Sequence, residues 1–371
     1  MKIAIILVHY HTPDFLLNAV EAIKSDLKLS GIEGEIIVID NGSRREDKEL
    51  LSSLSVKLIN PGENLGYARG VNLGVENTDA DIFILMNPDV EVLPHCIESL
   101  VSMLESGAAA AGPRFYLDKE KQIIHPPLMD LTIKNELLWR TSALGENWAK
   151  WVRGKWRKEA RIYWQTDVPI ESYLLTGALL AIRRDAWEKV GSFDGVYQLY
   201  YEEADWLKRL EKSKLKSYYV PAACAVHTYN QSAAKEPEAK KWFQESTEIF
   251  RKRHYGYLFN SFLNRMVPFI RRVSLINNPE QSNNSFSWTG VPLIDIASFN
   301  IVRNTPIWIE ISENDLGIPA AAMPVHNTEL KVWRFPKAIW DTLEPSTYHF
   351  RTVDNVGNEI HHSTFVHYQA I

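Results

Sequence analysis

Cysteine is scarce in this chain, which has only two among 371 residues, Cys96 and Cys224. They lie far apart and lack the paired spacing of a zinc site, so neither a disulfide framework nor a cysteine-bound metal is expected. Long apolar runs are lacking too. The run at Ile3–Val8 is too short for the core of a signal peptide, and none approaches the roughly 18 apolar residues that a membrane span needs. We therefore expect a cytoplasmic protein whose membrane contact, if it has any, is peripheral, at the inner face of the cell membrane.

An excess of positive charge is also absent. Lys and Arg number 41 against 46 Asp and Glu, a net charge of −5, which argues against nucleic acid as a partner. Basic residues nevertheless gather in two aromatic-rich stretches, 134–164 and 251–272. Three interpretations of these stretches are open: a tryptophan-bearing core under solvated basic faces, a surface that binds anionic membranes, or nucleic-acid contact, which the acidic balance disfavours.

The apolar content is ordinary and sufficient for a real core. Hydrophobic residues make up 45% of the chain, and at roughly 100–200 residues per domain its length allows about two domains. The polar segment 277–285 is the predicted linker. We expect one domain at 1–276 and a second, β-sandwich-like domain of immunoglobulin size at 286–371, where short alternating runs are separated by Pro, Gly and Asn. The second domain is a candidate for homo-oligomerisation or glycan contact.

Strands and helices alternate through the first 112 residues. Aliphatic runs typical of buried strands occur at 3–8 and 36–39, and further strands are predicted at 56–59 and 82–86. Helical spacing begins after Thr12-Pro13, where Thr12 is the predicted N-cap and Pro13 the first helical residue, and again after the glycine-rich turn 64–70. This alternation predicts an α/β domain with a mostly parallel, Rossmann-like sheet.

Polar side chains follow three of these predicted strands. His9 and Tyr10 come after the first, Asp40 after the second, and Asn87 and Asp89 after the fourth. In open α/β sheets, ligands bind at the carboxyl ends of the strands. The sequence therefore predicts a binding site at this edge.

Seven short motifs follow one another along the chain. They are Val-Ile-Asp-Asn-Gly-Ser at 38–43, Asn-Leu-Gly-Tyr-Ala at 64–68 with Asn72, Met-Asn-Pro-Asp-Val at 86–90, Thr-Gly-Ala at 176–178 with Arg183-Arg184, Gly-Ser-Phe-Asp at 191–194, Tyr-Glu-Glu-Ala-Asp-Trp at 201–206, and His227 with Ser232. In this order, residues 1 to about 260 resemble the family 2 glycosyltransferases, which have a GT-A fold, and within them the rhamnosyltransferase-like branch of cell-surface polysaccharide synthesis.

The resemblance implies a nucleotide-sugar donor lying across the strand ends. Asp40 would accept the N3–H of a pyrimidine base, although Asp at such a position also commonly caps a turn. The other donor-binding residues it implies are His9, Tyr10, Asn64, Gly66, Asn87, Gly177 and Ala178. Arg183 and Arg184 either contact phosphate or lead into a helix.

A divalent cation follows from the same resemblance. Asn87-Pro88-Asp89 occupies the position of the family's Asp-x-Asp motif, with Asn87 in place of the first carboxylate. Hard cations with oxygen ligands neutralise a diphosphate, so Asp89 is the predicted ligand of Mg²⁺ or Mn²⁺. His227 is the second predicted ligand; its alternative is a structural histidine near a strand end.

The motif at 201–206 carries the predicted catalytic carboxylates. Glycosyl transfer needs a base for the proton of the acceptor hydroxyl. Family members commonly have Glu-Asp where this chain has Glu202-Glu203, so Glu203 is the predicted base, with Glu202 and Asp205 in supporting roles. The alternative is a solvated acidic helix start.

These residues imply an inverting glycosyltransferase acting on a growing, lipid-linked or free surface glycan. The first candidate donor is dTDP-L-rhamnose and the second a UDP-hexose. A sugar nucleotidyltransferase is disfavoured, because it needs a glycine-rich basic loop where this chain has His9-Tyr10-His11-Thr12-Pro13. Asn87 and Glu203 keep open a non-catalytic scaffold of a polysaccharide-synthesis complex.

Overall fold

The computed structural model describes residues 1–44, 47–227, 238–277, 290–296, 299, 305–326 and 332–368. Two compact units divide the chain, the first made of 1–116 with 166–260 and the second of 117–165 with 261–371. Residues 278–285 of the predicted linker, and Ser232, lie outside the described residues. The predicted domain boundary at 277–285 thus stays a prediction. Residues 117–165 belong to the same compact unit as the C-terminal part of the chain.

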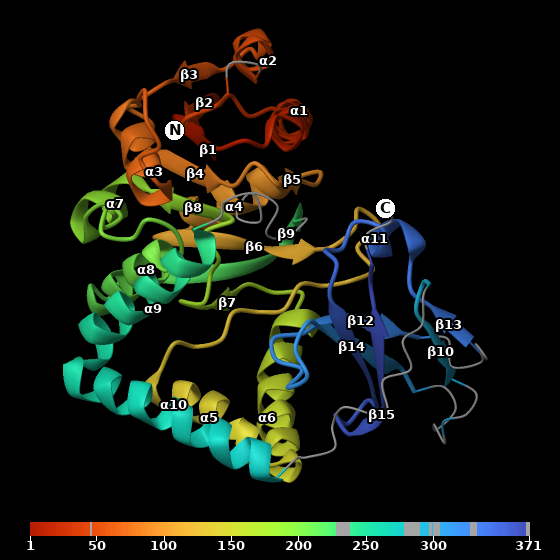
Figure 1. The fold of residues 1–371 in the computed structure, drawn as a ribbon. Coiled ribbons are helices and arrows are strands. Elements are labelled where there is room, and N and C mark those ends of the chain that lie inside the picture. The colour runs from red at the N-terminus through yellow and green to blue at the C-terminus, as the bar shows by residue number, and fades with distance from the viewer. Residues whose placement is uncertain are drawn as a thin grey trace. The chain divides into compact units, whose positions relative to one another are not determined.

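The first unit is built on a nine-stranded mixed sheet with the order β3-β2-β1-β4-β8-β6-β9-β5, and β7 pairs with β9 (Figure 1). Its strands are β1 Ile3–His9, β2 Glu35–Asp40, β3 Lys57–Ile59, β4 Ile82–Met86, β5 Val90–Val92, β6 Ala110–Tyr116, β7 Ile170–Glu171, β8 Leu179–Arg183 and β9 Ser217–His227. The first four pair in parallel, and β8 runs antiparallel to β4. The predicted α/β class is confirmed, and the sheet is mixed, since β8, β5 and β7 pair antiparallel with their neighbours.

Helices cover both faces of this sheet. Ile5 and Leu7 of β1 pack in one apolar cluster with α1 (Pro13–Ser30) and α4 (Cys96–Glu105). Ile6 and Val8 face the opposite cluster, with α3 (Tyr67–Glu76), α7 (Arg184–Val190) and α8 (Glu202–Lys212). Successive side chains of a strand point to opposite faces, which is why a continuous aliphatic run suits β1. The remaining helices of this unit are α2 (Asp47–Ser53) and α9 (Ala239–Tyr255).

Two contacts at the end of β1 bear on the helices that were predicted to follow it and the glycine-rich turn. Helix α1 begins at Pro13 as predicted, but the Thr12 side chain does not cap it. The Thr12 hydroxyl instead lies 3.4 Å from His9 Nδ1. On the other face, a Cβ at Gly70 would lie 2.9 Å from Val8 Cγ1, so a residue without a side chain lets α3 approach the sheet closely.

The second unit contains antiparallel sheets, as the predicted β-rich C-terminal part requires. One has the order β12-β11-β14-β15 and the other pairs β10 with β13. The strands are β10 Leu293–Asp295, β11 Ile307–Ser312, β12 Ala321–Val325, β13 Val332–Arg334, β14 Thr347–Val353 and β15 Glu359–Val366. The helices are α5 Ile133–Thr141, the 3-10 turn η1 Ser142–Leu144, α6 Glu146–Gln165, α11 Lys337–Trp340 and α10 Tyr257–Asn277, whose first turn belongs to the first unit.

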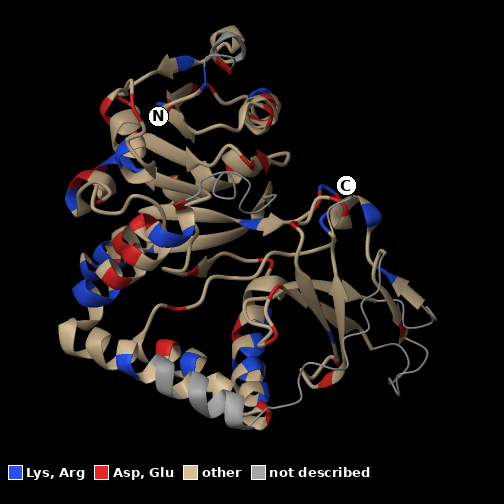
Figure 2. Cartoon of the chain, viewed as in Figure 1, with Lys and Arg blue, Asp and Glu red and all other residues tan. Residues whose placement is uncertain are grey.

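Helix α6 packs on β11, where the Trp164 and Trp308 ring centroids are 5.6 Å apart, and it carries many of the basic residues of the stretch 134–164 (Figure 2). Arg157 Nη2 donates to Glu310 Oε2 at 2.8 Å, with both side chains at most 3% exposed. Arg153 Nε donates to Glu359 Oε1 at 2.7 Å. Trp156 is buried, whereas Trp151 is 52% exposed. One face of α6 is therefore buried, whereas α5 has no buried residue.

Within the described part of the chain, no helix combines the length and apolarity that crossing a bilayer requires.

Candidate active site

Asp40 lies at the end of β2, opposite His9 in the parallel register. Its side chain is buried, and both carboxylate oxygens have partners. Oδ1 accepts from the Ser43 backbone N–H at 2.8 Å, and Oδ2 accepts from Asn60 Nδ2 at 2.9 Å. Asp40 thus caps the turn at Ser43, as the alternative interpretation of this residue predicted. Its role toward a base stays a prediction.

Asn41, which the sequence interpretation did not single out, ties β2 to the glycine-rich turn. Its Nδ2 donates to Asn64 Oδ1 at 2.8 Å, and its Oδ1 accepts from the Leu65 N–H at 2.7 Å. The Gly66 N–H also donates to Asn64 Oδ1, at 2.9 Å. The available signal was the place of Asn41 between a strand end and a glycine. Asn64 and Gly66 thereby lie beside the end of β2.

Gly66 has a conformation and surroundings that require glycine. Its φ is +76°, and a Cβ there would lie 2.8 Å from the Gln198 carbonyl oxygen. The next residue, Tyr67, donates its N–H to that same oxygen at 3.1 Å. The glycine-rich turn is therefore held against the loop that leads into α8.

Gly177 and Ala178 lie between the predicted donor and base residues. Tyr67 Oη donates to the Gly177 carbonyl at 3.0 Å. The Gly177 N–H donates to Glu203 Oε1 at 3.3 Å, and the Asn87 N–H donates to the Ala178 carbonyl at 2.8 Å. Three predicted segments thus meet on this short backbone stretch.

Negative charge surrounds Tyr67. Burial, and then the nearby charges of Glu202, Glu203 and Asp89, raise the pKa of Tyr67 well above its ordinary value. The three carboxylates come from two motifs more than 100 residues apart in the sequence. Asp89 and Glu203 therefore both lie within electrostatic reach of Tyr67.

Glu202 and Glu203 differ in how readily they ionise. Burial, and then the charge of Glu203, raise the pKa of Glu202 well above its ordinary value. Burial also raises the pKa of Glu203, but backbone N–H groups, including that of Gly177, oppose the rise. The second oxygen of each, Oε2, is buried without a hydrogen-bond partner among the described residues. Burial thus raises the pKa of both carboxyl groups, but more backbone N–H groups oppose the rise at Glu203 than at Glu202.

The backbone before the acidic pair is strained. Tyr200 and Tyr201 have φ values of +68° and +70°, a region that bulky side chains rarely adopt and that persists only where the surrounding structure holds it. Helix α8 begins directly afterwards, at Glu202. The positive end of the helix dipole therefore lies at the two glutamates.

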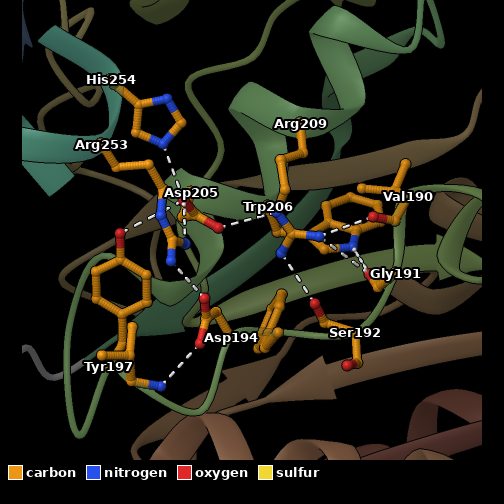
Figure 3. A network of polar contacts seen from close by, with 12 residues as sticks. Val190, Gly191, Ser192, Asp194, Tyr197, Asp205, Trp206, Arg209, Arg253 and His254 are labelled. Carbon is orange, nitrogen blue, oxygen red and sulfur yellow. Dashed lines mark hydrogen bonds and ion pairs between the residues drawn. The ribbon is translucent and has the colours of Figure 1, made fainter. Parts of the chain in front are cut away.

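Asp205 lies within the same helix turn but makes a different set of contacts (Figure 3). It is fully buried, with Oδ2 2.9 Å from Arg209 Nε and Oδ1 3.0 Å from Arg253 Nη1 and 2.8 Å from His254 Nε2. Burial would raise its pKa, but hydrogen bonds from His254, Arg253 and Arg209 hold it well below the ordinary range. Asp205 is therefore a carboxylate held by two arginines and a histidine. Its predicted role in support of the catalytic base stays a prediction.

Asp89 and His227 lie close enough to bind one cation. Both are buried, and Asp89 Oδ1 is 3.5 Å from His227 Nε2, because Val90 of β5 pairs with His227 of β9. Two ligand atoms that each lie about 2.1 Å from a cation can be at most about 4.2 Å apart. Among the described residues, no three His, Cys, Asp or Glu side chains form a metal cage. Mg²⁺ commonly uses one or two carboxylates besides phosphates and waters, so Asp89 fits such an ion, and His227 lies within reach of the same position.

Arg183 and Arg184, both open to two interpretations, have local partners. Arg183 Nε donates to Asp185 Oδ1 at 2.8 Å, and Arg184 Nη2 donates to the Thr78 carbonyl at 2.8 Å. Arg184 also lies over the Phe83 ring, 4.6 Å from its centroid. These contacts favour their role at the start of α7. His9 is fully buried, and Tyr10 packs against His11, with ring centroids 4.0 Å apart.

Comparison with known proteins identifies the family. The model of glycosyl transferase family 2 matches residues 4–179. The N-acetylglucosaminyl-diphospho-decaprenol L-rhamnosyltransferase of Mycobacterium tuberculosis is 30% identical over 243 residues, covering 60% of this chain and 76% of the relative. The low-salt glycan biosynthesis hexosyltransferase Agl10 of Haloferax volcanii is 20% identical over 279 residues, covering 74% of this chain and 80% of the relative.

Among solved structures, mannosyltransferase PcManGT from Pyrobaculum calidifontis, in complex with GDP-Man and Mn²⁺, matches with a TM-score of 0.46 and 12% identity, covering 74% of this chain and 73% of that chain. The family match includes Asp40 and Asp89, and the mycobacterial relative is covered over three quarters of its length. The chain is therefore a glycosyltransferase and belongs to glycosyl transferase family 2.

Proposed function

We propose that this enzyme transfers a sugar, with inversion, from a nucleotide-sugar donor to a hydroxyl of a surface glycan or its lipid-linked precursor. The first candidate donor is dTDP-L-rhamnose and the second a UDP-hexose. The names of the two relatives, an L-rhamnosyltransferase and a glycan-biosynthesis hexosyltransferase, support these choices. The observation that carries the proposal is the set of hydrogen bonds that joins Tyr67, Gly177 and Glu203, with Asn87 bonded to the neighbouring Ala178.

Glu203 is the proposed base. One of its oxygens accepts the Gly177 N–H, and the other has no partner among the described residues. In the proposed reaction the second oxygen takes the proton of the acceptor hydroxyl. The hydroxyl oxygen then bonds to the anomeric carbon, while the bond from that carbon to the diphosphate breaks. A single displacement of this kind inverts the configuration.

The donor is proposed to lie across the ends of β1, β2 and β4. Asp40, Asn64 and Gly66 would line the nucleoside, with His9 and Tyr10 beside them, and Asn87, Gly177 and Ala178 would line the sugar diphosphate. Asp89 and His227 would hold Mg²⁺ or Mn²⁺, which neutralises diphosphate charge when bound. The burial of Asp89 and the 3.5 Å between its Oδ1 and His227 Nε2 support this choice of ligands.

The acceptor determines where the enzyme works. A lipid-linked glycan would bring it from the cytoplasm to the inner face of an anionic membrane, and the basic aromatic stretch 251–272 is the proposed contact. Homo-oligomerisation through the C-terminal sheets is a further proposal.

A thermal-shift screen tests the proposal. The protein is heated with dTDP, UDP, GDP and dTDP-L-rhamnose, each with Mg²⁺, with Mn²⁺ or with a chelator. A ligand that binds the native state raises the melting temperature. At a hundredfold excess over Kd, it increases the free energy of unfolding by about 2.7 kcal/mol. We expect dTDP or UDP to do so with metal, and the matching nucleotide sugar to be consumed. If no nucleotide shifts the melting temperature and no donor is hydrolysed or transferred, the non-catalytic scaffold is the better interpretation.

A further inference from the structure

One face of α9 contacts the segments that carry the acidic pair. The contacting side chains follow helical spacing of three or four residues: Phe243, Ser246, Phe250, Arg253 and His254. Residues at this spacing lie along one stripe of a helix. None of these five side chains has a part in the predicted chemistry.

The first half of the stripe holds the strained loop. Ser246 Oγ donates to the Leu199 carbonyl at 2.9 Å. The Phe243 ring packs on Tyr200 at 5.4 Å between centroids, and the Phe250 ring packs on Tyr201 at 5.2 Å. The two tyrosines are those with positive φ, so α9 supplies the surroundings that such a backbone needs.

The second half of the stripe holds α8 and the loop before it. Arg253 Nη1 lies 3.0 Å from Asp205 Oδ1, and its Nη2 lies 2.6 Å from Asp194 Oδ2. His254 Nε2 lies 2.8 Å from Asp205 Oδ1 (Figure 3). Arg253 therefore joins α9, the first turn of α8 and the segment 191–197 through one guanidinium group.

We propose that α9 is a positioning helix, which through Ser246, Arg253 and His254 holds the Leu199–Tyr201 loop and the first turn of α8 so that Glu203 keeps its place against Gly177. This inference rests on the proposed role of Glu203 as the base. Arg253 acts through Asp205 and touches no reacting atom, so it is a positioning residue. Displacing a reacting group by about 1 Å can lower a rate by about a hundredfold, which gives such a helix catalytic weight.

Arg253→Gln is the main test variant, because Arg253 is 38% exposed and its loss leaves Arg209 and His254 on Asp205. Lys252→Gln is the matched control, since it removes the same charge one residue away and breaks only the 2.9 Å pair with Glu248 within α9. Arg253→Lys keeps the charge. Ser246→Ala removes the bond to Leu199, and its control Thr247→Ala removes a hydroxyl that bonds only within α9, to the Phe243 carbonyl.

Two measurements are made on the full chain. Hydrogen–deuterium exchange of the 198–206 segment should be faster in Arg253→Gln and Ser246→Ala, and unchanged in both controls. With the donor that the unmodified protein turns over, kcat should fall about 10- to 100-fold in Arg253→Gln while the Kd for dTDP or UDP stays within about twofold. Arg253→Lys should recover part of the lost kcat.

The outcomes separate this inference from the proposed function. Exchange and kcat equal to those of Lys252→Gln would overturn the positioning role, even if Glu203→Gln is inactive. A raised Kd for the nucleotide with unchanged kcat would also overturn it. If the unmodified protein transfers no sugar, the proposed function fails, while the exchange comparison still decides whether α9 holds the acidic turn.

Discussion

Gly177 lies directly against Glu203: its N–H donates to Glu203 Oε1 at 3.3 Å, and a Cβ at position 177 would lie 3.2 Å from Glu203 Cδ. The side chain of the proposed base is thus oriented by the backbone of a different segment. Because Tyr67 binds the carbonyl of the same glycine, the position of Glu203 depends on α3 as well as on α8.

Glu203→Gln keeps the size of the side chain and removes its basicity. We expect kcat to fall about 10²- to 10⁴-fold with the Kd of the nucleotide nearly unchanged. Glu211→Gln, an exposed position on the same helix, is the control for steady-state transfer assays. If Glu203→Gln keeps near-full turnover while Asp205→Asn is inactive, the base is Asp205 and not Glu203. Activity in all three of Glu202→Gln, Glu203→Gln and Asp205→Asn would make the cluster structural.

Asp89→Ala should abolish metal-dependent binding of a nucleoside diphosphate while leaving the fold intact, because it removes the carboxylate of the proposed cation site. Calorimetric titration of dTDP or UDP with Mg²⁺, with Mn²⁺ and with a chelator measures this, and circular dichroism checks the fold. Equal affinity of the unmodified protein with cation and with chelator would contradict a role for metal.

Glu202→Gln is expected to stabilise the protein at neutral pH. The pKa of Glu202 is higher in the folded than in the unfolded chain, so the folded state holds the proton more tightly and stability falls as pH rises from about 4.3 toward the folded pKa. The substitution removes this loss. The melting temperature should exceed that of the unmodified protein at pH 7–8, by about 2–4 °C per kcal/mol relieved, and the gain should vanish near pH 4. A gain independent of pH would contradict the titration of Glu202.

Arg157→Met should destabilise the second unit by about 3–5 kcal/mol, because it leaves Glu310 buried without its bidentate partner. Replacing both residues, as Arg157→Met with Glu310→Leu, should recover most of this loss. Lys337→Met, which breaks an exposed pair with Asp341, should change stability by less than about 1 kcal/mol. Urea unfolding followed by tryptophan fluorescence measures all three, and an equal effect of Lys337→Met would contradict the buried-pair argument.

The stretch 251–272 is expected to bind anionic membranes. Its described side chains include exposed Tyr257, Leu258 and Phe262, with Leu258 89% exposed; the side chains of Arg271 and Arg272 lie outside the described residues. The protein should float with anionic liposomes at low salt and not at 1 M salt, where the screening length is about 3 Å. Liposomes of neutral lipid are the control. Failure to float at low salt would favour a solvated basic face.

Structural elements that depend on a local sequence pattern could be predicted from the sequence. Elements that depend on contacts between distant residues could not. The runs at β1 and β4 are uninterrupted and aliphatic, so their strands were predicted to within a residue. By contrast, β9 mixes Tyr, Pro, Ala and Cys, and it completes the sheet through partners about 100 residues earlier, so no local pattern indicated it.

The site divides in the same way. Glu202, Glu203 and Asp205 form one motif that is visible in the sequence. Arg253 and His254, which hold Asp205, lie 48 and 49 residues later on α9. Their partner is set by helix packing in three dimensions, which periodicity alone does not encode. Likewise, the Gly177 contact to Glu203 depends on how β8 and α8 are arranged around Tyr67.

The interleaving of the two units along the chain changes how a smaller working enzyme has to be made. The polypeptide passes between them at 116/117, 165/166 and 260/261, so stopping synthesis near residue 280 would keep α6 while discarding Glu310 and Glu359, the carboxylates its arginines bind. Arg114 donates a hydrogen bond to the Thr166 carbonyl, which brings the two cut ends near each other. A minimal transferase would therefore splice residue 116 to residue 166 through a short linker and end at residue 260.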